Sequence, residues 1–224
     1  MTTWLITGAN RGLGLELSRQ LIARGDTVIG TARDLDKATE LIQLGATVLP
    51  LDVADDASVS ALAERLGDKP IDRLFNNAGM GGGRAGIGEI DMAQLSRFFE
   101  INSVGPLRVT QALLPNLRRG KDKLVLNMSS NLGSITNNTS GGAYGYRASK
   151  TALNMLTRSL ALDLTPEGFI CVVFHPGWVR TDMGGPSAPL TPEQSVASLL
   201  AVIDSLTPAR TGQFLSYDGT ELPW

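Results

Sequence analysis

The chain has 224 residues, of which 42% are hydrophobic, and its 20 lysines and arginines nearly balance its 22 aspartates and glutamates. This length and apolar content suffice for a substantial core, so we expect a single domain over residues 1–224. Because no long run of one charge sign occurs, nucleic acid and anionic membranes are poor candidates as partners.

Short strand-like runs alternate with helical patterns along the whole chain. Several runs are too apolar to alternate between inward and outward residues, which is typical of strands covered on both faces. The strand–helix–strand order with short connections implies parallel pairing through right-handed crossovers. We therefore predict an α/β protein, a single-domain Rossmann fold whose doubly wound parallel sheet of about seven strands carries helices on both faces. The predicted strands are TWLIT (3–7), TVIGTA (27–32), TVLPLD (47–52), IDRLFNN (71–77), KLVLNMS (123–129), FICVVFH (169–175) and GQFLSY (212–217).

Helical periods fill the intervals between these runs. Leu13, Leu17 and Leu21 form one stripe of a first helix that stops at Gly25. A long helical pattern covers residues 91–120, and residues 151–164 repeat apolar positions as in a core or subunit contact. The glycine-rich stretch 79–88 is predicted to be a mobile loop rather than a hinge between domains.

The beginning of the sequence and its cysteine content favour a cytoplasmic protein. The first residues, MTTWLITGAN, lack the basic region, long hydrophobic stretch and cleavage site of a signal peptide. No apolar run approaches the roughly 20 residues of a membrane helix. Cys171 is the only cysteine and lies in the apolar run FICVVF, where we expect a packed, unreactive thiol.

A glycine-rich turn follows the first predicted strand. LITGANRGLG places Gly8, Gly12 and Gly14 between this strand and the first helix. Glycines there allow a sharp turn and let a pyrophosphate approach the helix N-terminus, whose N–H groups favour an anion. A tight turn that binds nothing is the alternative, and the spacing is G-x-x-x-G-x-G rather than G-x-G-x-x-G.

The choice between nicotinamide cofactors depends on the end of the second predicted strand. Counting about 20 positions from Gly14 reaches Asp34, the usual place for an acid that holds ribose hydroxyls. The strand ends near Ala32, however, so Arg33 projects at the carboxyl edge, while Asp34 or Asp36 suits the cap of the next helix. With Arg11 in the glycine loop, two arginines indicate a 2'-phosphate and hence NADPH rather than NADH. A solvated surface charge is the alternative for Arg33.

The segment GGAYGYRASK contains two tyrosines and one lysine. On a helix Tyr146 lies one turn before Lys150, whereas Tyr144 is on another face. A neighbouring ammonium favours the phenolate, so this pair could pass a proton to a developing alkoxide. An ordinary tyrosine beside a solvated lysine is the alternative.

The motifs as a set resemble the short-chain dehydrogenase/reductase family essentially from end to end. HPGWVRTDMGG and GQFLSYDGTELPW further resemble the branch that contains C-factor and the sniffer-type carbonyl reductases. The motifs that carry the resemblance are TGANRGLG, LDV at 51–53, NNAG at 76–79, Asn102 in FEINSVG, NMSS at 127–130, Tyr146 with Lys150, and HPGWVRTDM at 175–183.

The resemblance implies four catalytic residues. Tyr146 would exchange the proton with the substrate oxygen, and Lys150 would lower the pKa of Tyr146 and bind the nicotinamide ribose. Ser130, which unlike Ser129 is followed by two residues and a glycine, would hydrogen bond the carbonyl oxygen. Asn102 would hold a water that relays protons to the lysine; a surface helix asparagine is the alternative.

The resemblance also implies the cofactor-binding segments. The glycine loop would meet the pyrophosphate, residues 52–53 the adenine and residues 77–79 the adenosine side, while residues 176–183 would close over the nicotinamide. The expected cofactor-binding residues are Gly8, Asn10, Arg11, Gly12, Leu13, Gly14, Arg33, Asp52, Val53, Asn77, Ala78, Gly79, Tyr146, Lys150, Pro176, Gly177, Val179, Thr181 and Met183.

Other chemistry receives little support. His175, the only histidine, precedes a proline, and no G-x-S-x-G motif exists, which argues against a hydrolase. There is no His/Cys cluster, so we expect no metal. Tyr144 and Trp178 are candidates to line a substrate pocket, with ordinary packing as the alternative.

These observations predict an NADPH-dependent oxidoreductase that reduces a ketone, aldehyde or quinone to an alcohol. Its partner would be a small carbonyl or alcohol substrate, and a homodimer is expected from its amphipathic helices and from the relatives it resembles. The alternatives are a dinucleotide-binding regulatory or signalling protein with little turnover, and alcohol oxidation with NADP in the reverse direction.

Overall fold

The computed structural model describes residues 1–82 and 85–224, and its centre is one parallel sheet. Seven strands are found in the described ranges, in the order β3-β2-β1-β4-β5-β6-β7, and each neighbouring pair is parallel. All seven strands predicted from the apolar runs are confirmed. Their bounds are β1 Thr3–Ile6, β2 Thr27–Ala32, β3 Thr47–Pro50, β4 Arg73–Asn76, β5 Leu124–Met128, β6 Ile170–His175 and β7 Phe214–Ser216.

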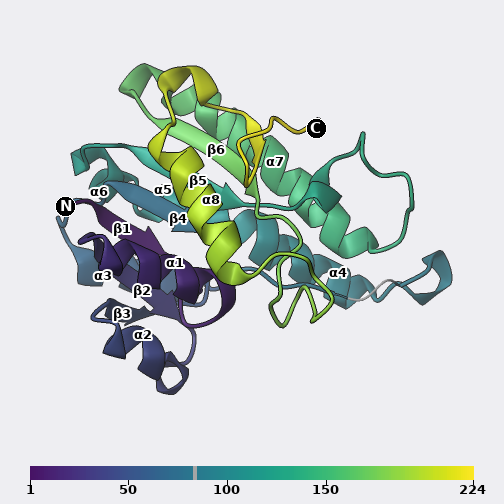
Figure 1. Cartoon of the computed structure of the whole chain (residues 1–224), viewed down its shortest axis with the longest axis horizontal. Coiled ribbons are helices and arrows are strands. Elements are labelled where there is room, and N and C mark those ends of the chain that lie inside the picture. The colour runs from purple at the N-terminus through teal and green to yellow at the C-terminus, as the bar shows by residue number, and fades with distance from the viewer. Residues whose placement is uncertain (83–84) are drawn as a thin grey trace.

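Helices cover both faces of this sheet (Figure 1), which confirms the predicted Rossmann-type fold. The pairs that pack together include α1 with α8, and α3 with α5. The bounds of the helices are α1 Gly12–Ala23, α2 Thr39–Gln43, α3 Asp56–Leu66, α4 Met92–Phe99, α5 Gly105–Ala112, α6 Leu114–Arg119, α7 Tyr144–Leu164 and α8 Pro192–Asp204.

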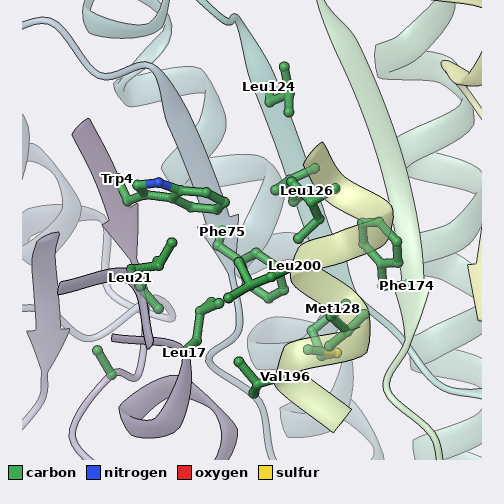
Figure 2. Close-up of a cluster of buried hydrophobic side chains, with 14 of the residues drawn as sticks. Trp4, Leu17, Leu21, Phe75, Leu124, Leu126, Met128, Phe174, Val196 and Leu200 are labelled. Atoms are coloured by element: carbon green, nitrogen blue, oxygen red, sulfur yellow. The ribbon is translucent and has the colours of Figure 1, made fainter. Parts of the chain in front are cut away.

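The core consists of two apolar layers, one on each face of the sheet. In the first, Leu17 and Leu21 of α1 meet Val196 and Leu200 of α8 over the side chains of β1, β4, β5 and β6 (Figure 2). The second lies against α3, α5, α6 and α7 and includes Cys171 on β6, as expected for a packed thiol. Burial raises the pKa of this thiol to about 12, which keeps it protonated.

The strand order places a switch point between β1 and β4. The chain moves outward from β1 to β3 and then returns to the other side of β1 to form β4. The loops that leave the carboxyl ends of β1 and β4 therefore diverge, and ligands of open α/β sheets bind at such a point.

The structure corrects the prediction of one long helix over residues 91–120. The helical path is divided into α4, a π-helical turn at Glu100–Val104, α5 and α6. Pro106 lacks the N–H that would bond the Asn102 carbonyl four residues earlier. Pro115 likewise has no N–H to donate, and it lies next to the break at Leu113. A π turn accommodates such a missing bond by inserting one residue.

None of the helices in the described ranges is both long and apolar enough to cross a membrane. The glycine-rich stretch predicted to be a mobile loop includes Gly83 and Arg84, which lie outside the described residues. Beside them, Ile87–Glu89 forms a short 3-10 turn.

Candidate active site

The glycine loop connects β1 to α1 at the switch point. Gly8 and Gly12 have φ angles of +64° and +55°, which side chains rarely adopt. A Cβ added at Gly14 would lie 2.6 Å from the Asn77 amide nitrogen, so a side chain there would displace the loop after β4. Arg11 and Gly12 are exposed, so the N-terminus of α1 is accessible to a ligand.

Thr7 joins this loop to the segment after β4. Its Oγ1 accepts hydrogen bonds from the backbone N–H groups of Asn77 and Ala78, both at 3.0 Å. In the other direction, Asn77 Nδ2 donates to the Thr7 and Gly8 carbonyls. Thr7 is a site-organising residue that the sequence reasoning missed, although it stands directly before Gly8 in the glycine motif.

The end of β2 agrees with the sequence prediction. The strand stops at Ala32, Arg33 follows as an exposed residue, and Asp34 caps the next 3-10 turn by accepting from the Asp36 N–H. Arg11 extends from the glycine loop and forms a 3.2 Å ion pair with Asp182; both side chains are exposed, at 70% and 87%. The two arginines are thus accessible cations on the loops that follow β1 and β2.

The π turn directs Asn102 inward. Its side chain is fully buried, which excludes the alternative of a surface asparagine. Oδ1 accepts from the Met80 N–H at 2.9 Å, and Nδ2 donates to the Met80 carbonyl at 3.0 Å and to Ser149 Oγ at 3.1 Å. Both Nδ2 hydrogens are thereby engaged, so a relay water on this side chain would have only the second lone pair of Oδ1.

The two serines after β5 have different environments. Ser129 is buried and donates to Asn154 Oδ1 at 2.7 Å, so its hydroxyl belongs to the packing of α7. Ser130 is half-buried and accepts from the Leu132 N–H. A Cβ added at Gly133 would lie 2.9 Å from the Lys150 Cβ. The glycine three residues after Ser130 therefore allows this turn to pack directly on α7.

Tyr146 and Lys150 lie on one face of α7. The Lys150 ammonium is 5.9 Å from the centre of the Tyr146 ring and donates to the Met128 carbonyl at 2.8 Å. Burial lowers the pKa of Lys150 to about 8. Burial raises the pKa of Tyr146, while a hydrogen bond with Ser130 acts in the opposite direction. Desolvation is the larger influence on the pKa of both groups. A lowering of the Tyr146 pKa by Lys150 stays a prediction.

Gly79 lies where these side chains converge. A Cβ added at this residue would be 3.2 Å from Asn102 Oδ1 and 3.6 Å from Lys150 Nζ. The structure thus brings Asn102, Tyr146, Lys150 and the loop after β4 to one place, with Ser130 adjoining Tyr146. This is the carboxyl edge of β4 and β5.

The segment at 176–183 passes over the loops after β1 and β4. Thr181 Cγ2 would be 3.8 Å from a Cβ at Gly12, and Met183 Cγ would be 2.7 Å from one at Gly81. Within the segment, Gly177 has a φ of +84°, Pro176 accepts from Ser195, and Val179 forms a β-bridge with Leu190. These contacts place residues 176–183 across the switch point.

The remaining predicted residues surround this centre. Asp52 accepts from the Ala54 N–H, Val53 is buried beneath Gly105, and Asn10 donates to the Lys37 carbonyl. Leu13 packs against the first core layer. Tyr144 and Trp178 remain 42% and 55% exposed, and the Trp178 indole N–H donates to the Gly184 carbonyl at 2.7 Å.

Hydrolytic and metal chemistry find no matching arrangement in the described residues. Burial lowers the pKa of His175 to about 4, and the charge of Asp218 opposes this shift only in part. The imidazole is therefore neutral near pH 7. No group of three or more His, Cys, Asp or Glu side chains within residues 1–82 and 85–224 is placed to hold a metal ion.

A family model described as short chain dehydrogenase matches residues 2–189. The chain belongs to this family. It is 52% identical over 164 residues to C-signal from Myxococcus xanthus, a match that spans 73% of this chain and 99% of C-signal. It is also similar to the solved structure of carbonyl reductase Sniffer of D. melanogaster, with 37% identity, a TM-score of 0.94 and complete coverage of both chains. An NADPH-bound carbonyl reductase from chicken fatty liver is 35% identical with a TM-score of 0.93, covering 100% of this chain and 99% of that one.

These relatives confirm the family and the branch that the sequence motifs indicated. As a short-chain dehydrogenase/reductase, the chain is an NAD(P)-dependent oxidoreductase.

Proposed function

We propose that this protein uses NADPH to reduce the carbonyl group of a ketone, aldehyde or quinone to an alcohol. The observation that carries the proposal is the assembly of Ser130, Tyr146 and a buried Lys150 beside the glycine loop. The similarity to carbonyl reductases, one of them in an NADPH-bound structure, supports the same reaction and cofactor.

The residues at the switch point fit a dinucleotide. The left-handed glycines at 8 and 12 expose backbone N–H groups at the N-terminus of α1, which favour a pyrophosphate. Arg11 and Arg33 supply two exposed cations for a 2'-phosphate. Because Gly79 has no side chain, the space next to Lys150 Nζ and Asn102 Oδ1 stays free. When bound there, NADPH would supply the hydride.

The chain's own residues would handle the charge and the proton. The Ser130 hydroxyl would donate a hydrogen bond to the carbonyl oxygen and stabilise the charge that develops on it. The ordinary pKa of a tyrosine is about 10 and burial raises that of Tyr146 further, so Tyr146 is protonated near neutral pH and acts as the general acid toward this oxygen. Lys150, with a pKa of about 8, can replace the proton on Tyr146. Asn102 would keep the Met80 backbone, and with it the loop after β4, in place.

The experiment that tests the proposal measures cofactor binding and turnover separately. Fluorescence titration gives Kd for NADPH and for NADH, and NADPH consumption is then followed with a panel of aldehydes, ketones and quinones. We expect tighter binding of NADPH and turnover of part of the panel. Tighter binding of NADH would contradict the cofactor assignment.

The identity to C-signal favours a second candidate, a dinucleotide-binding regulatory or signalling protein with little turnover. A protein that only binds the dinucleotide has no need of a proton donor beside a buried lysine, so Tyr146 and Lys150 argue against it. Tight NADPH binding without turnover of any panel member would favour this candidate. Oxidation of an alcohol with NADP would use the same residues in the reverse direction.

A further inference from the structure

The segment that ends in Trp224 lies against the loop that carries Ser130. The main-chain oxygen of Trp224 accepts from the Thr136 N–H at 3.0 Å, from Thr136 Oγ1 at 2.9 Å and from Ser134 Oγ at 3.3 Å. The two segments are 88 to 90 positions apart in the sequence. One main-chain oxygen thus fixes both ends of the three-residue stretch from Ser134 to Thr136.

The Trp224 side chain packs on strand β7 of the sheet. Its indole stacks on Phe214, with ring centres 5.7 Å apart and an angle of 27° between the planes. Phe214 is fully buried in β7, and its carbonyl accepts from the Leu222 N–H at 2.8 Å. The position of the Trp224 main-chain oxygen is therefore set by the sheet and by an aromatic stack of the kind worth about 1 kcal/mol.

The stretch that Trp224 holds continues directly from the Ser130 turn. Ser134 follows the 3-10 turn Asn131–Gly133, and its Oγ also accepts from the Asn137 N–H. On the opposite side, the Gly133 carbonyl accepts from Thr151 Oγ1 at 2.9 Å. The turn is therefore clamped between α7, which carries Tyr146 and Lys150, and the segment of Trp224.

We propose that Trp224 is a positioning residue of the active site. By holding Ser134 and Thr136 against the sheet, it keeps the Ser130 hydroxyl directed toward the substrate carbonyl. It acts through the loop and belongs to none of the cofactor-binding segments at the switch point. The inference rests on the role proposed above for Ser130.

The first test compares Trp224→Ala with Trp224→Phe in the full chain. A misplacement near 1 Å is enough to lower turnover greatly, so the alanine variant is expected to lose about tenfold or more in kcat/KM for a carbonyl substrate. Its Kd for NADPH should stay unchanged. Phenylalanine preserves the stack on Phe214 and should restore most of the loss. Glu221→Gln is the matched control, because Glu221 lies in the same segment but pairs with Gln213.

The second test requires no turnover. Hydrogen–deuterium exchange of the peptide covering residues 131–137 should quicken in Trp224→Ala and stay slow in Trp224→Phe. Both variants keep the main-chain oxygen that accepts from the Thr136 N–H, but only the alanine variant loses the aromatic stack on Phe214 that holds this oxygen in place. Thr136→Val removes one of the three hydrogen bonds from the loop side. Combined with Trp224→Ala, it should add less than its separate effect, as expected for two residues in one network.

The outcomes separate this inference from the proposed function. Unchanged exchange in Trp224→Ala, or faster exchange with unchanged kcat/KM, overturns the positioning role. A phenylalanine variant as impaired as the alanine variant overturns it as well. A wild-type protein without turnover of any carbonyl contradicts the proposed function instead, and the exchange experiment then still decides whether Trp224 orders the loop.

Discussion

Lys150 is a buried lysine, and burial separates its ammonium from the water that would stabilise the charge. Its ammonium is buried, and one hydrogen bond to the Met128 carbonyl is found for it in the described ranges. Because so few polar groups replace the lost water, burial disfavours the charged form of this side chain and lowers its pKa to about 8. The same shift brings its proton exchange close to neutral pH.

The lowered pKa of Lys150 predicts how stability changes with pH. Between about 8 and the ordinary value of 10.5, the unfolded chain binds a proton that the folded chain does not, so stability rises with pH across this interval. Lys150→Met removes the charge and should increase the free energy of unfolding near pH 7 by about 2 kcal/mol, with a flatter dependence above pH 8. Urea unfolding near pH 7 and near pH 9.5 measures both effects. A variant less stable than the wild type near pH 7 would contradict this explanation.

Arg11 and Arg33 decide the cofactor preference in our account. Both are exposed on loops at the switch point, and Arg11 forms an ion pair with Asp182 in which both partners are solvated. Arg11→Ala combined with Arg33→Ala should weaken NADPH binding at least tenfold while changing NADH binding little, because only NADPH carries the 2'-phosphate. Fluorescence titration with both cofactors measures the difference. Equal losses for the two cofactors would refute the phosphate assignment.

At the scale of elements, the packing of the Ser130 turn on α7 determines the shape of the site. Gly133 is the contact point, and an added Cβ would lie 2.9 Å from the Lys150 Cβ and 3.0 Å from its carbonyl carbon. Because backbone atoms form part of this contact, a side chain at residue 133 must move one of the two elements.

We therefore expect Gly133→Ala to lower kcat at least tenfold and to reduce stability by about 1–3 kcal/mol. Gly88→Ala is the matched control, since a Cβ there meets no atom of the described residues within 4 Å. Steady-state kinetics and urea unfolding of both variants measure the effects. A Gly133→Ala protein with wild-type kinetics would show that this close contact is not needed.

The elements also show where prediction from sequence succeeds and where it stops. The seven strands were predictable because each is a short apolar run bounded by turn residues. The π turn was not, since it depends on Pro106 within a helical pattern and on contacts of Asn102 with Met80 and Ser149, 22 and 47 positions away. Pro106 is visible in the sequence, but the contacts of Asn102 arise only when the chain has folded.

The same distinction applies to the candidate site. Tyr146, Lys150 and Ser130 were identified from local spacing and family motifs, and the structure brings them together. Their pKa directions follow from burial, which spacing does not reveal. The contacts of Thr7 with the loop after β4 and of Trp224 with the Ser130 loop join distant segments, so no local pattern pointed to them.

At the scale of the whole molecule, α7 presents apolar side chains outward. Met155 and Leu162 are seven residues apart on this helix and both are about two-thirds exposed, at 66% and 62%. Residues at this spacing share a helix face, and a monomer gains nothing by exposing them together.

We expect a homodimer formed through this face of α7. Light scattering of the purified protein should give the mass of two chains, and Leu162→Glu should shift it toward one chain because the dimer would bury the new charge. The proposed catalytic residues of one chain all lie at its own sheet edge, so cofactor binding should survive in this variant. A wild-type mass of one chain would rule out the dimer in solution.

The most direct test of the central claim compares two tyrosines on α7. Tyr146→Phe removes the proposed proton donor, while Tyr144→Phe makes the same change two residues earlier on an exposed side chain. NADPH consumption with a carbonyl substrate is measured for both, together with NADPH binding. Our account predicts that Tyr146→Phe binds NADPH but loses nearly all turnover, and that Tyr144→Phe retains most of it. The reverse pattern, or full turnover in both variants, would contradict it.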